Sequence, residues 1–203
     1  MKKIYLSLLS GCFINLLFSQ NPLPIRGCGA NTLPQQFETW LQSVTPTNSA
    51  KTNSGQIQSV FNIPVIVHVI HNNEALNSTT ATTGGNLNTA QIYDQINILN
   101  RDFNGTNADT SLIPAAFKPM LGKFQFNFCL AVVNATGGIL AEPGIERINR
   151  VSAGWSAPPY SQTYVDNTIK PASIWNTSKY MNMWVCGLSN SILGYATFPN
   201  PGT

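Results

Sequence analysis

The stretch Ile63-Pro-Val-Ile-Val-His-Val-Ile70 decides the fold of this chain. It is an almost unbroken run of β-branched residues, which is typical of a strand that is covered on both of its faces. The polar stretch that follows, residues 72–85, predicts a loop. Such a strand belongs to a parallel sheet, so the flanking sequence has to supply neighbouring strands and covering helices.

A helix is predicted after this loop. Asn88, with Gln91 three residues later, resembles a capping box, which satisfies backbone N–H groups at a helix N-terminus. The helix is expected to end near residues 104–105, where Asn-Gly follows the last apolar residue. The apolar residues that recur at helical spacing are Ile92, Ile96, Leu99 and Phe103.

Two further strands are predicted. Phe124, Phe126 and Phe128 alternate with other residues, which indicates a strand over residues 124–130 with one apolar face. Strand, helix and strand form a βαβ unit, so these strands should be parallel. A third strand is expected over residues 180–188, and the proline-rich stretch 136–178 is interpreted as loops.

This set of elements leaves one face of the predicted sheet without a helix. A parallel sheet needs helices on both faces, and only the helix after Asn88 is convincing beyond residue 60. Either loops cover the second face, or the sequence is an incomplete domain. The predicted fold class is α/β, with a mostly parallel, twisted sheet and one backing helix.

The composition excludes several classes of protein. The chain has 203 residues, of which 43% are hydrophobic and only 9% are charged, against roughly 25% charged residues in an average soluble protein. Wholesale disorder needs few aromatics and a high net charge, so it is excluded. The net charge of +3 includes Lys2 and Lys3, and no basic stripe remains elsewhere, so no nucleic-acid partner is expected.

The N-terminus predicts export. Residues 1–20 combine Lys2 and Lys3 with the apolar run 4–18, which is typical of a signal peptide and is shorter than the ~20 residues that span a bilayer. Leu9-Ser-Gly-Cys12 resembles a lipoprotein cleavage box, but the apolar run continues past Cys12, so lipid anchoring there is the less favoured alternative. No other segment reaches membrane-spanning length. We expect a secreted chain with no membrane span.

Export leaves an odd number of cysteines. After removal of Cys12, the chain keeps Cys28, Cys129 and Cys186, and an oxidising compartment allows two of them to pair. Cys129 and Cys186 lie on predicted strands, so a disulfide can form only if those strands are close, and it is excluded if the Cα atoms are more than ~7 Å apart. Two separate buried thiols are the alternative.

Several blocks of sequence, in order and at plausible spacing, match a known family. They are Phe61–His71 (FNIPVIVHVIH), Leu87–Gly105 with its Leu-Asn-Arg-Asp-Phe-Asn ending, Phe126–Ala131 (FNFCLA), Gly144–Arg147 (GIER), Tyr180–Cys186 (YMNMWVC) and Leu193–Pro199 (LGYATFP). Together they resemble the pappalysin family of metzincin zinc metallopeptidases. The resemblance implies that residues 59–203 are a metzincin-like N-terminal subdomain, and that the intact parent uses zinc to hydrolyse proteins or peptides.

The resemblance extends to the segment before this subdomain. Arg26-Gly-Cys28-Gly resembles the Arg-x-Cys-Gly segment of bacterial family members, so residues 21–58 are interpreted as a propeptide-like segment and linker. There it implies a latency device, in which the Cys28 thiolate occupies the open position of the catalytic zinc. A structural or unpaired thiol is the alternative. Tyr195 and Ala196 would lie near the rim of the substrate cleft.

The residues that hold zinc in metzincins are missing from this sequence. The family motif is H-E-x-x-H-x-x-G-x-x-H, whereas this chain has two histidines, His68 and His71, and no His-Glu pair. Residues three apart on a strand point to opposite faces and cannot close on one metal. We therefore expect no catalytic residue and no metal ligand in this chain, and zinc only in the intact parent. The acidic residues, which show no paired spacing, are scattered over Asp94, Asp102, Asp109, Glu142, Glu146 and Asp166.

These observations lead to two hypotheses. In the first, the chain is the N-terminal fragment of a secreted zinc-dependent endopeptidase, truncated before the zinc-binding helix and inactive by itself. In the second, it is a non-catalytic secreted binding module derived from the same fold. The sequence downstream distinguishes them, because only the first requires the zinc-binding motif there.

Overall fold

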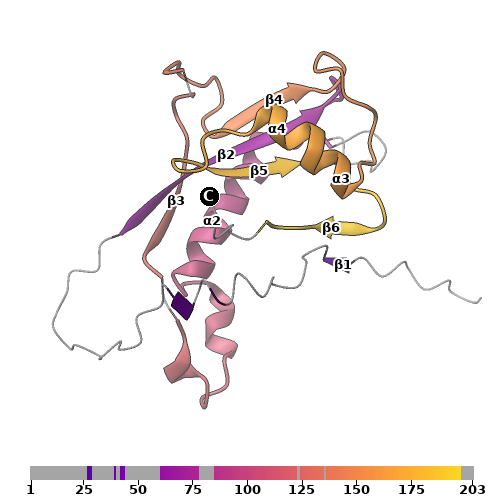
Figure 1. The fold of residues 1–203 in the computed structure, drawn as a ribbon. Coiled ribbons are helices and arrows are strands. Elements are labelled where there is room, and N and C mark those ends of the chain that lie inside the picture. The colour runs from indigo at the N-terminus through magenta and orange to yellow at the C-terminus, as the bar shows by residue number, and fades with distance from the viewer. Residues whose placement is uncertain are drawn as a thin grey trace, which may run out of the picture.

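One strand organises the sheet. The structure is a computed structural model that describes residues 27–28, 39, 42–43, 60–77, 85–122, 124–134 and 136–197. Strand β2 (Phe61–His71) runs through the centre of the sheet, and its residues 65–70 are buried, as the β-branched run predicts. It pairs in parallel with β3 (Phe126–Leu130), β4 (Ile145–Asn149) and β5 (Met181–Val185) (Figure 1).

The registers define the order of these strands. β3 pairs with residues 61–65 of β2, β4 with residues 67–71, and β5 with residues 65–69. A strand has only two edges, and β5 overlaps the register of both β3 and β4. β3 and β4 therefore follow one another along one edge of β2, and β5 occupies the other edge. The predicted α/β class with a mostly parallel sheet is confirmed.

Helix α2 (Thr89–Phe103) covers one face of this sheet, as predicted. The Asn88 side chain accepts a hydrogen bond from the backbone N–H of Gln91 at 2.8 Å, which begins the helix. Ile92 and Ile96 are 4% and 5% exposed and pack against the odd-numbered residues of β2. Burying such a side chain contributes about 2–3 kcal/mol, so this apolar stripe holds α2 on the sheet.

The second face is covered by a helical segment where the sequence pattern predicted a loop. Residues 162–173 form α3 (Gln162–Tyr164), the π-helix η3 (Val165–Ile169) and α4 (Lys170–Ser173). Val165 and Ile169, four residues apart, are buried against Ile70 of β2. The expectation that no helix covers this face is therefore wrong. The wider stretch 136–178, which was interpreted as loops, also contains strand β4. The π-helical turn and Pro171 obscure the helical spacing.

A second, smaller sheet and a projecting lobe complete the described part of the chain. β6 (Ile192–Gly194) pairs in parallel with β1 (Gly27–Cys28). Beyond α2, the chain forms a lobe that projects away from the sheet and contains two 3₁₀ turns, η1 (Ala108–Leu112) and η2 (Lys118–Met120) (Figure 1). The signal peptide predicted for residues 1–20, Cys12 included, and most of the propeptide-like segment lie outside the described residues.

The suggested disulfide is not formed. Cys129 lies opposite Pro64 on one edge of β2, whereas Cys186 follows Val185, which lies opposite Val69 on the other edge. Two strand spacings separate the cysteines by at least ~9 Å, which exceeds the reach of a disulfide. Both are free thiols, in agreement with the alternative of two separate cysteines. Within the described ranges, no helix combines the length and the apolar character that a bilayer crossing requires.

Candidate substrate-binding site

The edge of β6 is the first component of the candidate site. On this edge β1 lies in a parallel register, with Gly27 opposite Ile192 and Cys28 opposite Gly194. Strand edges recognise extended peptides because their free N–H and C=O groups form main-chain hydrogen bonds independently of sequence. Here the edge of β6 holds an extended segment of the chain itself. The side chain of Cys28 lies outside the described residues, so the thiolate switch stays a prediction.

A pocket of about 280 Å³ lies beside β6. It is open to solvent, and residues of β6, of the end of β5 and of the helical segment 162–173 line it. Aromatic and aliphatic side chains form most of its wall. The side chains that matter for its chemistry are Val165, Lys170, Trp184, Cys186, Leu193 and Tyr195.

An ion pair and a tyrosine form the polar part of this pocket. The Lys170 ammonium lies 2.6 Å from Asp166 Oδ1, and the Tyr195 hydroxyl donates a hydrogen bond to the same oxygen at 2.8 Å. The ammonium also lies 4.3 Å from the centroid of the Tyr195 ring and 5.6 Å from that of Trp184. The Asp166 carboxylate therefore neutralises the charge of Lys170, and the two rings add a cation–π attraction.

The protonation states of the lining groups favour binding over chemistry. Burial raises the pKa of the Cys186 thiol to about 11, so a negligible fraction is thiolate at neutral pH. Burial, followed by the hydrogen bond to Asp166, raises the pKa of Tyr195 above its usual value. Neither group is an activated nucleophile or base. The pocket is suited to hold an apolar or aromatic side chain of a peptide that lies along β6.

The structure places the two predicted rim residues beside this pocket. Tyr195 is half-buried in its wall, and Ala196 is exposed at the next position. Contact with substrate remains a prediction for both. Lys170 and Asp166 were not predicted as members of a site, although their spacing of four residues, typical of an ion pair on a helix, was a signal that could have found them.

His68 lies elsewhere, in a buried polar network between β2, β4 and β5. Its side chain is fully buried, with Nδ1 2.6 Å from Glu146 Oε2 and Nε2 2.9 Å from Asn182 Oδ1. The Trp175 indole N–H donates to the same Glu146 oxygen at 3.2 Å. The ring of His68 also stacks on Trp184, with centroids 5.1 Å apart.

The donors and acceptors of this network determine where its protons lie. Asn182 Oδ1 accepts from the backbone N–H of Trp175, and Asn182 Nδ2 donates to the carbonyls of Trp175 and Tyr180. The amide orientation is thus set by backbone groups, and His68 Nε2 must donate to Oδ1. Nδ1 faces a carboxylate, so a proton lies on the Nδ1···Oε2 contact as well. The buried His68 and the partly exposed Glu146 therefore form a hydrogen-bonded pair.

The described residues do not fit a zinc ion. Both nitrogens of His68 are engaged in the network, and Nδ1 of His71 accepts a hydrogen bond from the backbone N–H of Asn73 at 3.0 Å. Across the described ranges, no three His, Cys, Asp or Glu side chains gather in a group that could hold a metal. The zinc chemistry of metzincins therefore needs residues other than these.

Three of the scattered carboxylates each serve a local partner. Glu142 forms two hydrogen bonds with the Arg147 guanidinium, at 2.5 and 2.9 Å, and the bond from Arg147 holds the pKa of Glu142 below its usual value. Glu146 pairs with His68, and Asp166 with Lys170. These contacts are typical of structural roles rather than of paired acid–base catalysis.

Comparison with solved structures finds similarity to mirolysin of Tannerella forsythia. Three of the similar structures are a promirolysin mutant, mature mirolysin in complex with a cleaved peptide, and mirolysin in complex with compound 9. Each is 35% identical in sequence over 69% of this chain, with TM-scores of 0.56, 0.56 and 0.55. A scan of protein-family models and a search of curated proteins gave no match.

The similarity covers only part of each mirolysin structure. The chain spans 41% of the promirolysin structure and 47% of the two mirolysin structures, which is less than half of each. The mixed α/β arrangement with a mostly parallel sheet is shared with these neighbours. The similarity to mirolysin thus supports the metzincin-like relationship that the sequence blocks predict.

Proposed function

We propose that this chain supplies the N-terminal part of the catalytic domain of a secreted zinc-dependent endopeptidase of the pappalysin family. The sequence blocks from Phe61–His71 to Leu193–Pro199 support the family. The 35% identity to mirolysin over 69% of the chain supports the metallopeptidase relationship. The N-terminal sequence features support secretion, with residues 1–20 as the signal peptide.

The observation that carries the proposal is the pairing of β1 with β6 beside a pocket. An endopeptidase has to hold an extended peptide, and an accessible strand edge does so through main-chain hydrogen bonds. Gly27–Cys28 occupies this edge, next to a pocket whose walls are mostly apolar and aromatic. One of the similar structures is of mature mirolysin in complex with a cleaved peptide. In the proposed enzyme, a protein or peptide substrate takes the place that β1 occupies here.

The same pairing gives the propeptide-like segment a role. With Gly27 opposite Ile192 and Cys28 opposite Gly194, β1 occupies the strand edge that a substrate would need. This supports the proposal that residues 21–58 maintain latency until they are removed. The thiolate of Cys28 would serve that latency in the intact parent, as the resemblance implies.

The hydrolytic centre is proposed to come from residues outside this sequence. The motif H-E-x-x-H-x-x-G-x-x-H supplies zinc ligands and a general base in metzincins, and this sequence contains no His-Glu pair. The described residues do not fit zinc either. We propose that this chain by itself hydrolyses no peptide bond.

The experiment that tests the proposal begins with the coding sequence downstream of residue 203. We expect it to encode the zinc-binding motif, and the longer protein to hydrolyse casein in a manner that a chelator abolishes and added zinc restores. The 203-residue chain, purified in parallel, should be inactive. Chelator-sensitive hydrolysis by the short chain would overturn the ligand argument. A downstream sequence without the motif would favour the non-catalytic binding module instead.

A further inference from the structure

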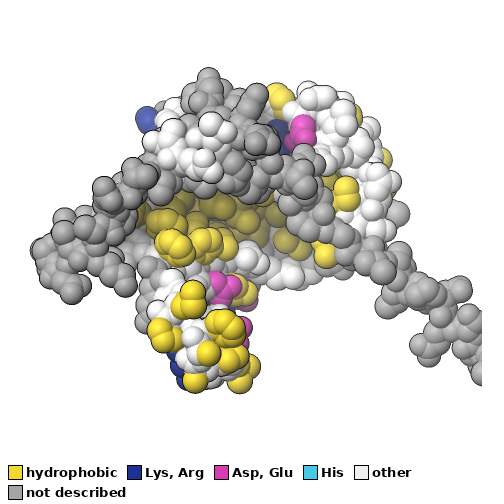
Figure 2. All heavy atoms as spheres, turned by 60° about the horizontal axis from the view of Figure 1, so that its bottom comes forward, with side chains coloured by type: hydrophobic (Ala, Val, Ile, Leu, Met, Phe, Trp, Pro, Cys, Tyr) yellow, Lys and Arg dark blue, Asp and Glu magenta, His cyan; other side chains and the backbone are white. Residues whose placement is uncertain are grey.

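Hydrogen bonds attach the short strand β6 to the rest of the fold on both of its sides. Figure 2 shows hydrophobic side chains gathered over the projecting lobe, whereas the contacts that flank β6 are polar. Before β6, the backbone N–H of Tyr160 donates to the Gly187 carbonyl and that of Ser189 donates to the Tyr160 carbonyl, both at 2.8 Å. After β6, the Tyr195 hydroxyl donates to Asp166 Oδ1, also at 2.8 Å. Both attachments lead to one short stretch of the chain at the start of the helical segment.

β6 is too short to hold its position by itself. It has three residues and pairs with the two residues of β1, and a two-stranded sheet is marginally stable at best in water. Asn190 and Ser191, which precede β6, have φ of +58° and +56°. Non-glycine residues keep this conformation only where the surrounding structure imposes it. The position of β6 therefore depends on contacts outside its own sheet.

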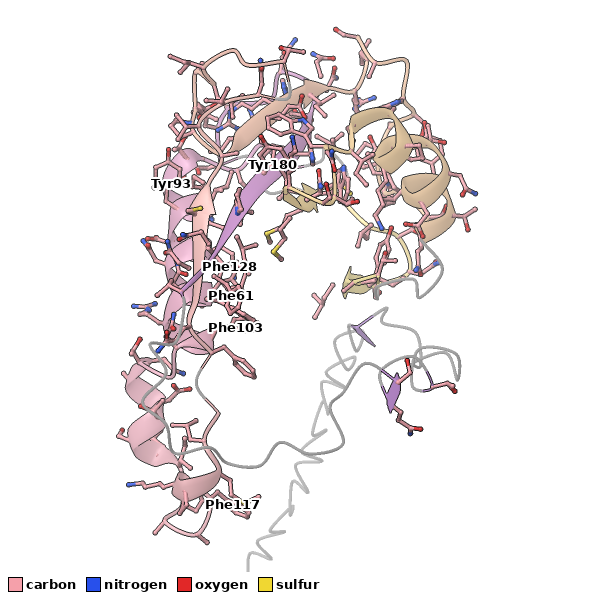
Figure 3. The ribbon with its side chains drawn as sticks, turned by 60° about the vertical axis from the view of Figure 1, so that its left-hand side comes forward. Phe61, Tyr93, Phe103, Phe117, Phe128 and Tyr180 are labelled. Atoms are coloured by element: carbon pink, nitrogen blue, oxygen red, sulfur yellow. The ribbon has the colours of Figure 1, made fainter. Side chains whose placement is uncertain are left out.

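The helical segment that carries Asp166 is anchored to the main sheet. Val165 and Ile169 are buried against β2, and the Trp184 indole N–H of β5 donates to Ser173 Oγ at 2.9 Å. The segment lies alongside β6 (Figure 1), and Figure 3 shows side chains between the two. Asp166 is thus held in place by apolar burial and by a hydrogen bond at the end of its segment. A contact from Asp166 can transmit this fixed position to β6.

Lys170 keeps the Asp166 carboxylate in the orientation that the contact needs. Its ammonium lies 2.6 Å from the same Oδ1 that accepts from Tyr195, and 4.3 Å from the centroid of the Tyr195 ring. The ammonium therefore attracts the carboxylate as an ion pair and the ring through a cation–π contact. We call Asp166, Lys170 and Tyr195 the latch.

We propose that Asp166 is a positioning residue, which holds β6 through Tyr195 in the place where its edge pairs with an extended segment. Gly27–Cys28 is that segment in this structure, and the statement that a substrate takes its place rests on the proposed function. An edge that is already ordered loses less conformational entropy when a peptide binds. The latch therefore strengthens the binding of the peptide and does not take part in the chemical step.

Amide hydrogen exchange of the full 203-residue chain tests the latch. Tyr195→Phe and Asp166→Ala should each raise the exchange rate of residues 192–194 and 27–28 about tenfold, because one hydrogen bond to a carboxylate is lost. Exchange of the buried residues 65–70 should stay unchanged, which shows that the variants are folded. Asp166→Asn should keep most of the protection, since its amide oxygen still accepts from the tyrosine hydroxyl.

Tyr164→Phe is the matched control. It removes the hydroxyl of another tyrosine of the same helical segment, which accepts from the backbone N–H of Ser156 at 3.0 Å and lies on no path to β6, so its exchange should match that of the parent chain. Three results would overturn the proposal: unchanged exchange of residues 192–194 in Tyr195→Phe, equal losses of protection in Asp166→Asn and Asp166→Ala, or faster exchange in Tyr164→Phe that equals that of Tyr195→Phe.

Kinetics of the longer enzyme separate the latch from the proposed function. Tyr195→Phe should raise KM for an extended peptide about tenfold and leave kcat within about twofold, because the lost interaction holds the peptide equally before and during the reaction. A fall in kcat at unchanged KM would refute the positioning role. An inactive longer protein would instead refute the peptidase function, while the exchange rates of residues 192–194 would still decide whether the latch holds β6.

Discussion

Replacing Glu146 with alanine should destabilise the fold far more than the loss of an ordinary surface carboxylate. In the structure one oxygen of Glu146 accepts two hydrogen bonds, from His68 Nδ1 and from the indole N–H of Trp175. The other ring nitrogen of His68, Nε2, donates its hydrogen bond to Asn182 Oδ1. Glu146→Ala therefore leaves two donors without an acceptor in the interior of the sheet.

The magnitude follows from these two donors. A buried donor without an acceptor costs about 1–3 kcal/mol, so the substitution should lower the free energy of unfolding by about 3 kcal/mol. The upper end of the range for a broken buried ion pair, ~5 kcal/mol, does not apply, because the Glu146 side chain is 35% exposed and water can enter part of its place. With a urea m-value of about 2 kcal/mol/M, the midpoint should fall by about 1.5 M.

The assay is urea denaturation followed by tryptophan fluorescence and far-UV circular dichroism. Trp175 and Trp184 lie in the network and report on it directly. Asp94→Ala, which removes an exposed carboxylate of α2, serves as the control and should change the free energy of unfolding by less than ~0.5 kcal/mol. Equal effects of the two substitutions would refute the reasoning. Glu146→Gln should be milder than Glu146→Ala, since its amide oxygen still accepts one hydrogen bond.

Three other measurements test separate features of the molecule. Gly144→Ala should lower the free energy of unfolding by about 2–4 kcal/mol in urea denaturation, because φ is +71° and the new Cβ would lie 2.4 Å from Leu130 Cδ2. Gly154→Ala, where φ is +75° but the surrounding space is open, should cost only about 1 kcal/mol. Equal losses would contradict the steric argument. The hydrogen bond from Arg147 lowers the pKa of Glu142, so this pair stabilises the fold above the usual carboxyl pKa, and its contribution is lost as pH falls through the lowered pKa. The free energy of unfolding of Glu142→Gln should therefore depend less on pH in the acid range than that of the parent chain. An unchanged pH dependence would contradict the role of this ion pair. Elemental analysis of the purified 203-residue chain should find no stoichiometric zinc, and one tightly bound ion per chain would reverse the conclusion about its ligands.

The elements that were predicted correctly are those whose pattern is local and uninterrupted. The β-branched run of β2 and the apolar stripe of α2 each follow a single period, and the predicted boundaries of α2 agree with the structure at Asn88 and Asn104. β3 and β5 were also found, although they begin at Phe126 and Met181 and are shorter than predicted. Such patterns can be recognised in the sequence because one face of each element is buried and therefore apolar at a regular spacing.

The elements that were missed do not show a regular spacing of apolar residues. In residues 162–173 a π-helical turn changes the helical spacing, and Pro171 within the stretch favours a loop prediction. β4 carries Glu146 and Arg147 between Ile145 and Ile148 and ends on Asn149, so its five residues resemble a polar loop. β1 has two residues and β6 three, and strands of that length have no period to detect.

The candidate site depended on contacts between distant parts of the chain. Tyr195 could be proposed from its sequence block, but its hydrogen bond to Asp166 joins residues that are far apart in the sequence. The pairing of Cys28 with Gly194 is likewise a long-range event that no local pattern contains. The suggested pairing of Cys129 with Cys186 failed for the same reason, since the order of strands across β2 is a property of the whole sheet.

The central position of β2 has a consequence for how the protein is made. Its free edge is closed by Met181–Val185, which the ribosome synthesises more than a hundred residues after β2 itself. Sheets built from such distant partners fold slowly, and until β5 is available the nascent chain presents an unpaired, strongly apolar strand. We expect newly made protein to need a holding chaperone during this interval, and any shortened chain that ends before residue 185 to precipitate.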